Sequence, residues 1–210
     1  MLCGYFERLI SFLGVAEATV ELIDDDYKPY IHSFFDKLTV VYKKIVANAA
    51  KYYNIDEIFF HDDWGSERAS MLSPDTIREM IAPYLKRVVD CAHNNGLKFE
   101  LHSCGHNATN IPIMIECGVD MWEPQARCND VAKYWEEYGD KIMFGIDTDF
   151  PPAMSDEECM QAVKAYVEKY GAHMKEKPFF NGATPYFMNL HPKLSEYCYE
   201  YSRKYFCGEK

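Results

Sequence analysis

Residues 97–106, Leu-Lys-Phe-Glu-Leu-His-Ser-Cys-Gly-His, decide the fold. The first half of this stretch is apolar enough for a buried strand, and the second half is polar. A helix pattern precedes it, because Ser73-Pro74-Asp75 supplies an N-cap, a first-turn proline and an early carboxylate. Asn95-Gly96 then ends that helix at about residue 94. A helix followed by a buried strand with a polar end is a unit of a parallel sheet.

The same unit recurs along the chain. The strand patterns lie at residues 58–60, 97–101, 119–122, 141–145 and 178–180. The helix patterns lie at 27–53, 73–94, 111–116, 130–138, 155–170 and 192–205, so an initial helical segment precedes five strands. This alternation predicts an α/β fold with a parallel sheet. No linker or repeat divides the chain, so we expect a single domain over residues 1–210.

Polar side chains follow each predicted strand, namely Asp62 and Asp63, His102 and Cys104, Glu123 and Gln125, Asp147 and Asp149, and Asn181. A (β/α)8 barrel gathers its chemistry at the carboxyl ends of its strands, and an open doubly wound sheet does so at its switch point. A complete barrel has eight strands and about 250 residues. Five strands in 210 residues are too few to close one.

Composition narrows the function classes. The net charge of -11 argues against binding to nucleic acid or to an acidic membrane surface. No apolar run approaches the ~20 residues of a membrane span, and Glu7 and Arg8 interrupt the short apolar start, unlike a signal peptide. We therefore expect a cytoplasmic protein. The eight cysteines fall mostly inside helix and strand patterns, so we expect buried free thiols rather than disulfides.

His102 and Cys104 are two residues apart at a strand end. Side chains two apart on a strand point to the same face, so both can approach one ion. Zinc favours imidazole and thiolate ligands, and a catalytic zinc site leaves one position open. The alternative is a buried histidine hydrogen-bonded to backbone beside an inert cysteine.

Asp62 and Asp63 are consecutive, so a strand would direct only one of them into a cavity. A carboxylate buried beside Trp64 would have a raised pKa and could act as a general acid or base. The alternative is a capping or loop role. Asp147 and Asp149 present the same choice, since they precede Pro151-Pro152, which also suits a structured loop.

Three segments together resemble the uroporphyrinogen decarboxylase superfamily, which includes the zinc-dependent methylcobamide methyltransferases. They are His61-Asp62-Asp63-Trp64-Gly65-Ser66, Leu101-His102-Ser103-Cys104-Gly105 and Phe144-Gly145-Ile146-Asp147-Thr148, in this order. The resemblance implies a (β/α)8 TIM-type barrel of which the five strands correspond to the fourth to eighth. The chain would then be a partial barrel, and its open edges predict a homo-oligomer or a complementing N-terminal half-barrel chain.

The resemblance also implies site residues. His102 and Cys104 would bind zinc, and the zinc would keep a substrate thiol nucleophilic toward a methyl group. A corrinoid, carried by a separate partner protein, would hold that methyl group. Asp62 would be catalytic, at the substrate cavity. Asp63, Trp64, Asp147 and Asn181 would contact the small-molecule substrate.

The chain departs from the methyltransferase pattern at the third zinc ligand. The resemblance implies a cysteine just after the last strand, where residues 180–183 are Phe-Asn-Gly-Ala. Glu123 or Asp147 could serve instead, and Cys128 and His106 are further alternatives. Two other functions stay open: uroporphyrinogen decarboxylation, which needs no metal, and a non-catalytic or split-barrel subunit.

Overall fold

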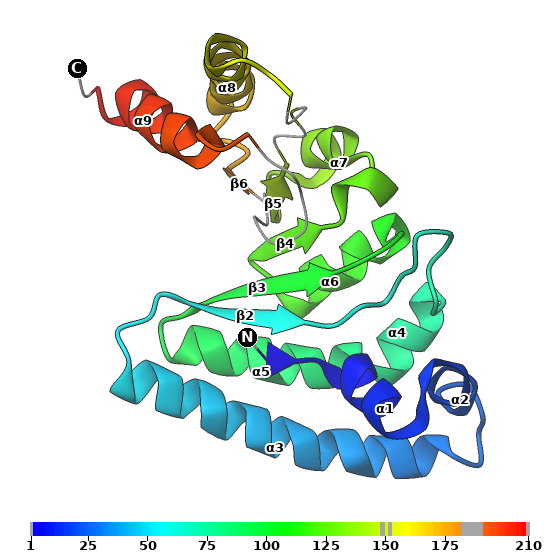
Figure 1. The fold of residues 1–210 in the computed structure, drawn as a ribbon. Helices are drawn as coiled ribbons and strands as arrows, with labels where there is room; N and C mark the ends of the chain where they lie inside the picture. Colours follow the sequence, from blue (N-terminus) through cyan, green and yellow to red (C-terminus); the bar gives the residue numbers. More distant parts are fainter. Residues whose placement is uncertain (1, 148–149, 151–152, 182–190, 209–210) are drawn as a thin grey trace.

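The computed structural model describes residues 2–147, 150, 153–181 and 191–208. Its centre is a parallel sheet with strand order β1-β2-β3-β4-β5-β6, so each strand lies beside its neighbour in sequence (Figure 1). The strands are β1 (Leu2–Cys3), β2 (Glu57–His61), β3 (Lys98–Ser103), β4 (Met121–Pro124), β5 (Met143–Ile146) and β6 (Phe179–Asn181). Within the described residues the sheet is not closed, which confirms a partial (β/α)8 barrel.

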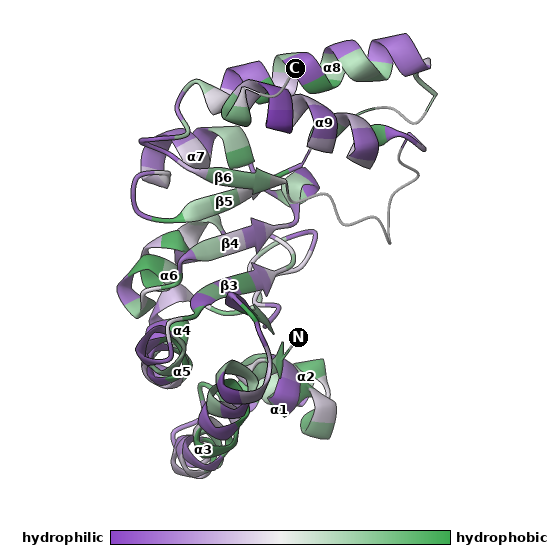
Figure 2. Cartoon of the chain, turned by 90° about the vertical axis from the view of Figure 1, so that its left-hand side faces the viewer, coloured by the Kyte–Doolittle hydropathy of each residue, from purple (hydrophilic) through white to green (hydrophobic). Residues whose placement is uncertain are grey.

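Helices connect the strands and cover one face of the sheet, as Figure 2 shows for α5, α6 and α7. The bounds are α1 (Tyr5–Leu13), α2 (Val15–Glu21), α3 (Lys28–Tyr52), α4 (Pro74–Met80), α5 (Ala82–Asn94), α6 (Ile111–Cys117), α7 (Val131–Tyr138), α8 (Asp156–Gly171) and α9 (Leu194–Cys207). Short 3₁₀ turns lie at Ala108–Asn110 and Ala126–Cys128. No described helix is long and apolar enough to cross a membrane.

Two expectations about the elements were wrong. The described sheet contains six strands, because β1 precedes β2 and pairs with it in parallel. The predicted helix over 73–94 is two helices that meet at Ile81. Pro83 explains the break, because it has no N–H to donate to the carbonyl four residues earlier and its ring collides with that turn. The predicted Ser73 cap is confirmed, since its side chain accepts the N–H of Thr76.

The register of the strands decides which side chains share a face. His61 on β2 is opposite His102 on β3, and His102 is opposite Glu123 on β4. Residues that alternate with these, such as Phe60, Phe99 and Leu101, are fully buried in the hydrophobic core. The row formed by His61, His102 and Glu123 therefore lies on the face away from that packing, at the carboxyl ends of three adjacent strands.

Candidate metal centre at the strand ends

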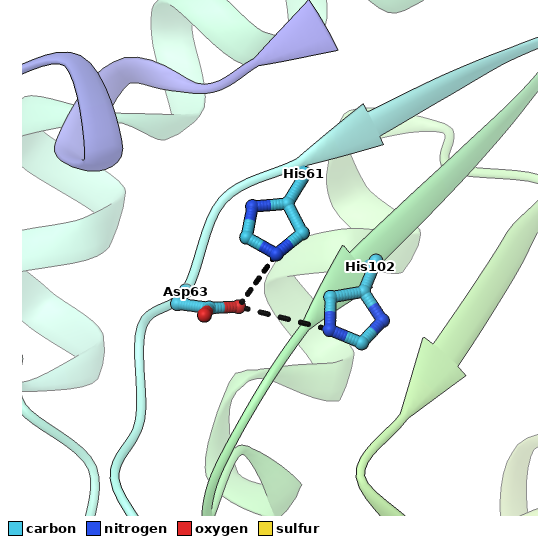
Figure 3. A group of neighbouring side chains, drawn as sticks. All are labelled: His61, Asp63 and His102. Carbon is cyan, nitrogen blue, oxygen red and sulfur yellow. Dashed lines mark ion pairs between the residues drawn. The ribbon is translucent and has the colours of Figure 1, made fainter. Parts of the chain in front are cut away.

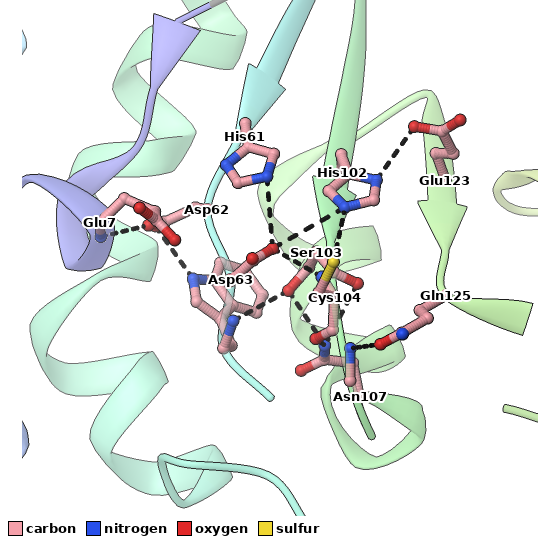
Figure 4. Close-up of polar contacts among 12 residues, drawn as sticks. Glu7, His61, Asp62, Asp63, His102, Ser103, Cys104, Asn107, Glu123 and Gln125 are labelled. Carbon is pink, nitrogen blue, oxygen red and sulfur yellow. Dashed lines mark hydrogen bonds and ion pairs between the residues drawn. The ribbon is translucent and has the colours of Figure 1, made fainter. Parts of the chain in front are cut away.

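His102 is the centre of the polar cluster at this end of the sheet (Figure 4). Its Nδ1 lies 3.0 Å from Oε2 of Glu123, and its Nε2 lies 3.1 Å from Sγ of Cys104. Burial lowers the pKa of this imidazole, but the hydrogen bonds with Cys104 and Glu123 outweigh burial and raise the pKa to about 10. The ring therefore stands between two groups, a carboxylate and a thiol, that can each accept a proton from it.

His61 and Asp63 join His102 in a second set of contacts (Figure 3). Oδ1 of Asp63 lies 3.6 Å from Nε2 of His61 and 3.8 Å from Nε2 of His102. The two imidazoles are stacked, with 4.9 Å between ring centroids and 8° between ring planes. One donor atom from each of the three residues lies within 4.8 Å of the others, a spacing that could hold a metal ion.

The loop after β3 is held in place by backbone contacts. The N–H of Cys104 donates to Oδ1 of Asp63 at 2.7 Å, and the N–H of Gly105 donates to Oε1 of Gln125 at 2.9 Å. The amide of Asn107 donates to the carbonyl of Cys104 and to Oγ of Ser103. These bonds tie the loop to the segments that follow β2 and β4, so the position of the Cys104 thiol is set by three segments of the chain.

Asp62 and Trp64 lie on the other side of the β2 strand end. The fully buried carboxylate of Asp62 accepts the N–H groups of Tyr5 and Glu7 in the first turn of α1 and the indole N–H of Trp64. Burial raises the pKa of Asp62 to about 7, although the donors oppose that shift. Trp64 is also fully buried. The catalytic role of Asp62 and the substrate contact of Trp64 stay predictions, and both side chains face protein groups.

The other predicted site residues lie at or after the ends of other strands. Asp147 is partly exposed just after β5, and Asn181 pairs through its backbone with Ile146. The side chain of Asn181, and Asp149, lie outside the described residues. Cys128 contacts Gln125 at 3.5 Å, and the exposed His106 contacts the carbonyl of Glu67. The roles predicted for Asp147 and Asn181 stay predictions.

His61 was not among the predicted site residues, and Asp63 was predicted to contact substrate rather than a metal. The signal for His61 was present, since it is the last residue of a strand and directly precedes the Asp-Asp-Trp-Gly motif. Its importance depends on its register with His102, which pairs two segments about forty residues apart.

The protein is thus of the partial (β/α)8-barrel class, with a cluster of imidazole, thiol and carboxylate groups at the carboxyl ends of its strands. The chain belongs to the uroporphyrinogen decarboxylase family, because the family model "Uroporphyrinogen decarboxylase (URO-D)" matches residues 21–184. This confirms the resemblance drawn from the three motifs. No curated protein gives a significant match.

Among solved structures, a methyltransferase from Methanosarcina mazei has a similar fold, with a TM-score of 0.69 at 16% sequence identity. The alignment covers 97% of this chain and 57% of that chain. The present chain therefore spans little more than half the length of this structural relative. The likeness extends over almost every element described above and concerns the fold.

Proposed function

We propose that this chain contributes the metal-binding half of a zinc-dependent methyltransferase, which moves a methyl group between a corrinoid and a thiol or similar acceptor. The observation that carries this proposal is the position of His102, with Cys104 on its Nε2 side and Glu123 on its Nδ1 side. The fold shared with a methyltransferase supports it. The methyl donor, the corrinoid-carrying partner and the acceptor are parts of the proposal.

The donor set suits zinc. An imidazole nitrogen and a thiolate sulfur are the ligands that zinc prefers, and the two atoms lie 3.1 Å apart on a partly buried surface. Zinc bound there would act as a Lewis acid that lowers the pKa of a coordinated substrate thiol.

Each neighbouring residue has a task that follows from its contacts. Glu123 fixes the His102 ring by accepting from Nδ1, which leaves Nε2 directed at Cys104, the arrangement found around metal-bound histidines. The ligand role predicted for Glu123 thus stays a prediction, and its contact with Nδ1 favours an orienting role. Asp63 and Gln125 hold the backbone on either side of the Cys104 side chain.

The experiment is a zinc analysis by mass spectrometry on purified wild type, Cys104→Ser and His102→Ala. Cys207→Ser is the matched control, because Cys207 is an exposed thiol at the end of α9. We expect nearly one zinc per chain in the wild type and the control, and a zinc content far below one per chain in the two site variants. Zinc content unchanged in Cys104→Ser would rule out this site.

Uroporphyrinogen decarboxylation is the second candidate, because the description of the matching family favours it. It would be carbon–carbon bond cleavage without a metal. Incubation of the chain with uroporphyrinogen, followed by chromatographic separation of the porphyrins, separates the two candidates. Turnover that survives chelators and the Cys104→Ser substitution would replace methyl transfer with decarboxylation.

A further inference from the structure

The resemblance to the methyltransferases implies a second cysteine ligand just after the last strand, and this chain has no cysteine there. His102 and Cys104 by themselves would give the ion only two ligand atoms. We propose that His61, the last residue of β2, and Asp63, on the loop after it, complete the metal site, so that the ion has two imidazoles, a carboxylate and a thiolate available to it. A substrate thiol would displace one of these four groups or enter as a fifth ligand. This inference rests on the proposed function only in requiring an ion at His102.

The first support is geometric. Metal bonds to nitrogen or oxygen of about 2.0–2.1 Å place tetrahedral ligand atoms about 3.3 Å from one another. Oδ1 of Asp63 is 3.6 Å from Nε2 of His61 and 3.8 Å from Nε2 of His102. These two separations exceed the ideal by only a few tenths of an ångström. The donor atoms of the three residues all lie within 4.8 Å of one another, so small side-chain rotations would bring them together around an ion.

The second support is the way the backbone presents these groups. His61 and His102 are directly opposite each other in the parallel register, and their rings are stacked at 4.9 Å. Asp63 is already oriented, because its Oδ1 accepts the N–H of Cys104 at 2.7 Å. The cluster is thus organised by main-chain contacts before any ion arrives, which lowers the cost of binding.

The third support is charge and access. The side chains of His61, Asp63 and His102 are 26%, 22% and 16% exposed, so the cluster is partly buried yet open to an entering ion. Asp63 and a Cys104 thiolate would together neutralise a divalent cation. Two nitrogens, an oxygen and a sulfur form a set of intermediate softness, which suits Zn²⁺ and Co²⁺ better than Mg²⁺ or Ca²⁺.

The test uses Co²⁺ as a spectroscopic probe on the full chain. A thiolate ligand produces a near-ultraviolet charge-transfer band, and the visible bands report the number and type of the other ligands. The variants are His61→Ala, Asp63→Asn and Cys104→Ser. Asp63→Asn retains an oxygen that can accept the N–H of Cys104, so the loop should keep its structure. Asp75→Asn is the matched control, because the Asp75 side chain is fully exposed.

We expect wild type and Asp75→Asn to bind one Co²⁺ with the thiolate band. His61→Ala and Asp63→Asn should each bind at least about tenfold more weakly, with altered visible bands and a retained thiolate band. Circular dichroism confirms that each variant is folded, and His61→Asn replaces His61→Ala if the latter is not.

The outcomes separate the two proposals. Wild-type affinity and unchanged visible bands in both the His61 and the Asp63 variants would overturn this inference and leave zinc at His102 and Cys104 intact. Binding that lacks the thiolate band yet depends on His61 and Asp63 would support this inference and overturn the role of Cys104. A wild type that binds neither Co²⁺ nor Zn²⁺ overturns both.

Discussion

The carboxylate of Asp62, on the loop after β2, accepts the backbone N–H of Glu7 in the first turn of α1 at 2.9 Å. Its second oxygen accepts from the N–H of Tyr5 at 3.1 Å and from the indole of Trp64 at 3.0 Å. Figure 4 shows Asp62 directed at Glu7 and Asp63 directed at the two histidines. Neighbouring carboxylates thus have different surroundings, one at a helix N-terminus and one beside the two histidines of the candidate metal site.

Asp62→Ala should destabilise the fold, because it leaves two N–H groups of α1 and one indole N–H without their acceptor. Losses of this kind cost about 2–3 kcal/mol in unfolding free energy. Urea denaturation at pH 5 would measure the loss, because above the raised pKa of Asp62 the cost of burying its charge offsets it. Asp75→Ala, at a fully exposed carboxylate in the first turn of α4, should change stability by less than about 1 kcal/mol. Wild-type stability of Asp62→Ala would contradict the capping role.

The glycines of the two strand-end motifs contact each other. A Cβ added at Gly105 would lie 2.2 Å from the backbone carbon of Gly65, and Gly105 also has a φ of +75°. Gly105→Ala should therefore separate the loops after β2 and β3 and cost about 3 kcal/mol or more. Gly96→Ala is a matched control, because Gly96 has the same φ of +75° with nothing within 4 Å of its added Cβ.

Only the backbone strain of about 1 kcal/mol applies at Gly96. The difference between the two variants in denaturation midpoint, at unchanged slope, isolates the cost of the loop contact. Equal destabilisation by the two substitutions would show that the contact of Gly105 with Gly65 contributes nothing.

Asp120 should make stability depend on pH. Burial raises the pKa of this carboxyl, but Lys98, His93 and the N–H of Phe99 together hold the pKa below its ordinary value. A lowered pKa stabilises the folded state above the unfolded pKa of about 3.9, and that contribution disappears as pH falls through the folded pKa.

Asp120→Asn should therefore lower the unfolding free energy by about 1–2 kcal/mol at pH 7. The gap from wild type should narrow as the pH falls below about 4. Thermal unfolding of both proteins across this range measures the gap. A gap that is independent of pH would show that charge at Asp120 is not the cause.

Strand periodicity predicts part of this site and leaves another part open. Alternation places His102 and Cys104 on one face and allows only one of Asp62 and Asp63 into the cavity, as the structure has it. Which carboxylate enters depends on α1, whose first turn meets Asp62 from more than fifty residues away. Local pattern cannot supply that partner.

The same limit applies to β1 and His61. A strand of two residues is too short to show a period, and β1 forms because β2 offers it a parallel edge. The proximity of His61 to His102 requires the register between β2 and β3. In a parallel sheet that register depends on the packing of the connecting helices, which no short motif encodes.

Two substitutions at Glu123 would show whether this residue orients His102 or binds the metal itself. If it orients His102 through Nδ1, Glu123→Ala should weaken zinc binding about 10- to 100-fold, and Glu123→Gln should restore most of the affinity, since its amide oxygen can accept the same proton. If Glu123 is a ligand, Gln should fail as Ala does. Competition with a chromophoric chelator measures the affinities, and nitrogen NMR of the His102 ring reports the tautomer.

An exposed apolar groove between α1 and α3 leads us to expect that the protein self-associates. Phe12 and Tyr30 are 69% and 74% exposed, and with neighbouring apolar residues they line a groove of about 340 Å³. Exposed apolar surface of this kind marks interaction sites, and β1 is an edge strand within the described sheet.

We expect light scattering to give a mass above that of one chain, and the double variant Phe12→Ser/Tyr30→Ser to shift the protein toward the monomer. Tyr199→Ser, at an exposed tyrosine on α9, should leave the mass unchanged. A wild type that stays monomeric over the whole concentration range would mean that this surface does not pair with a second copy.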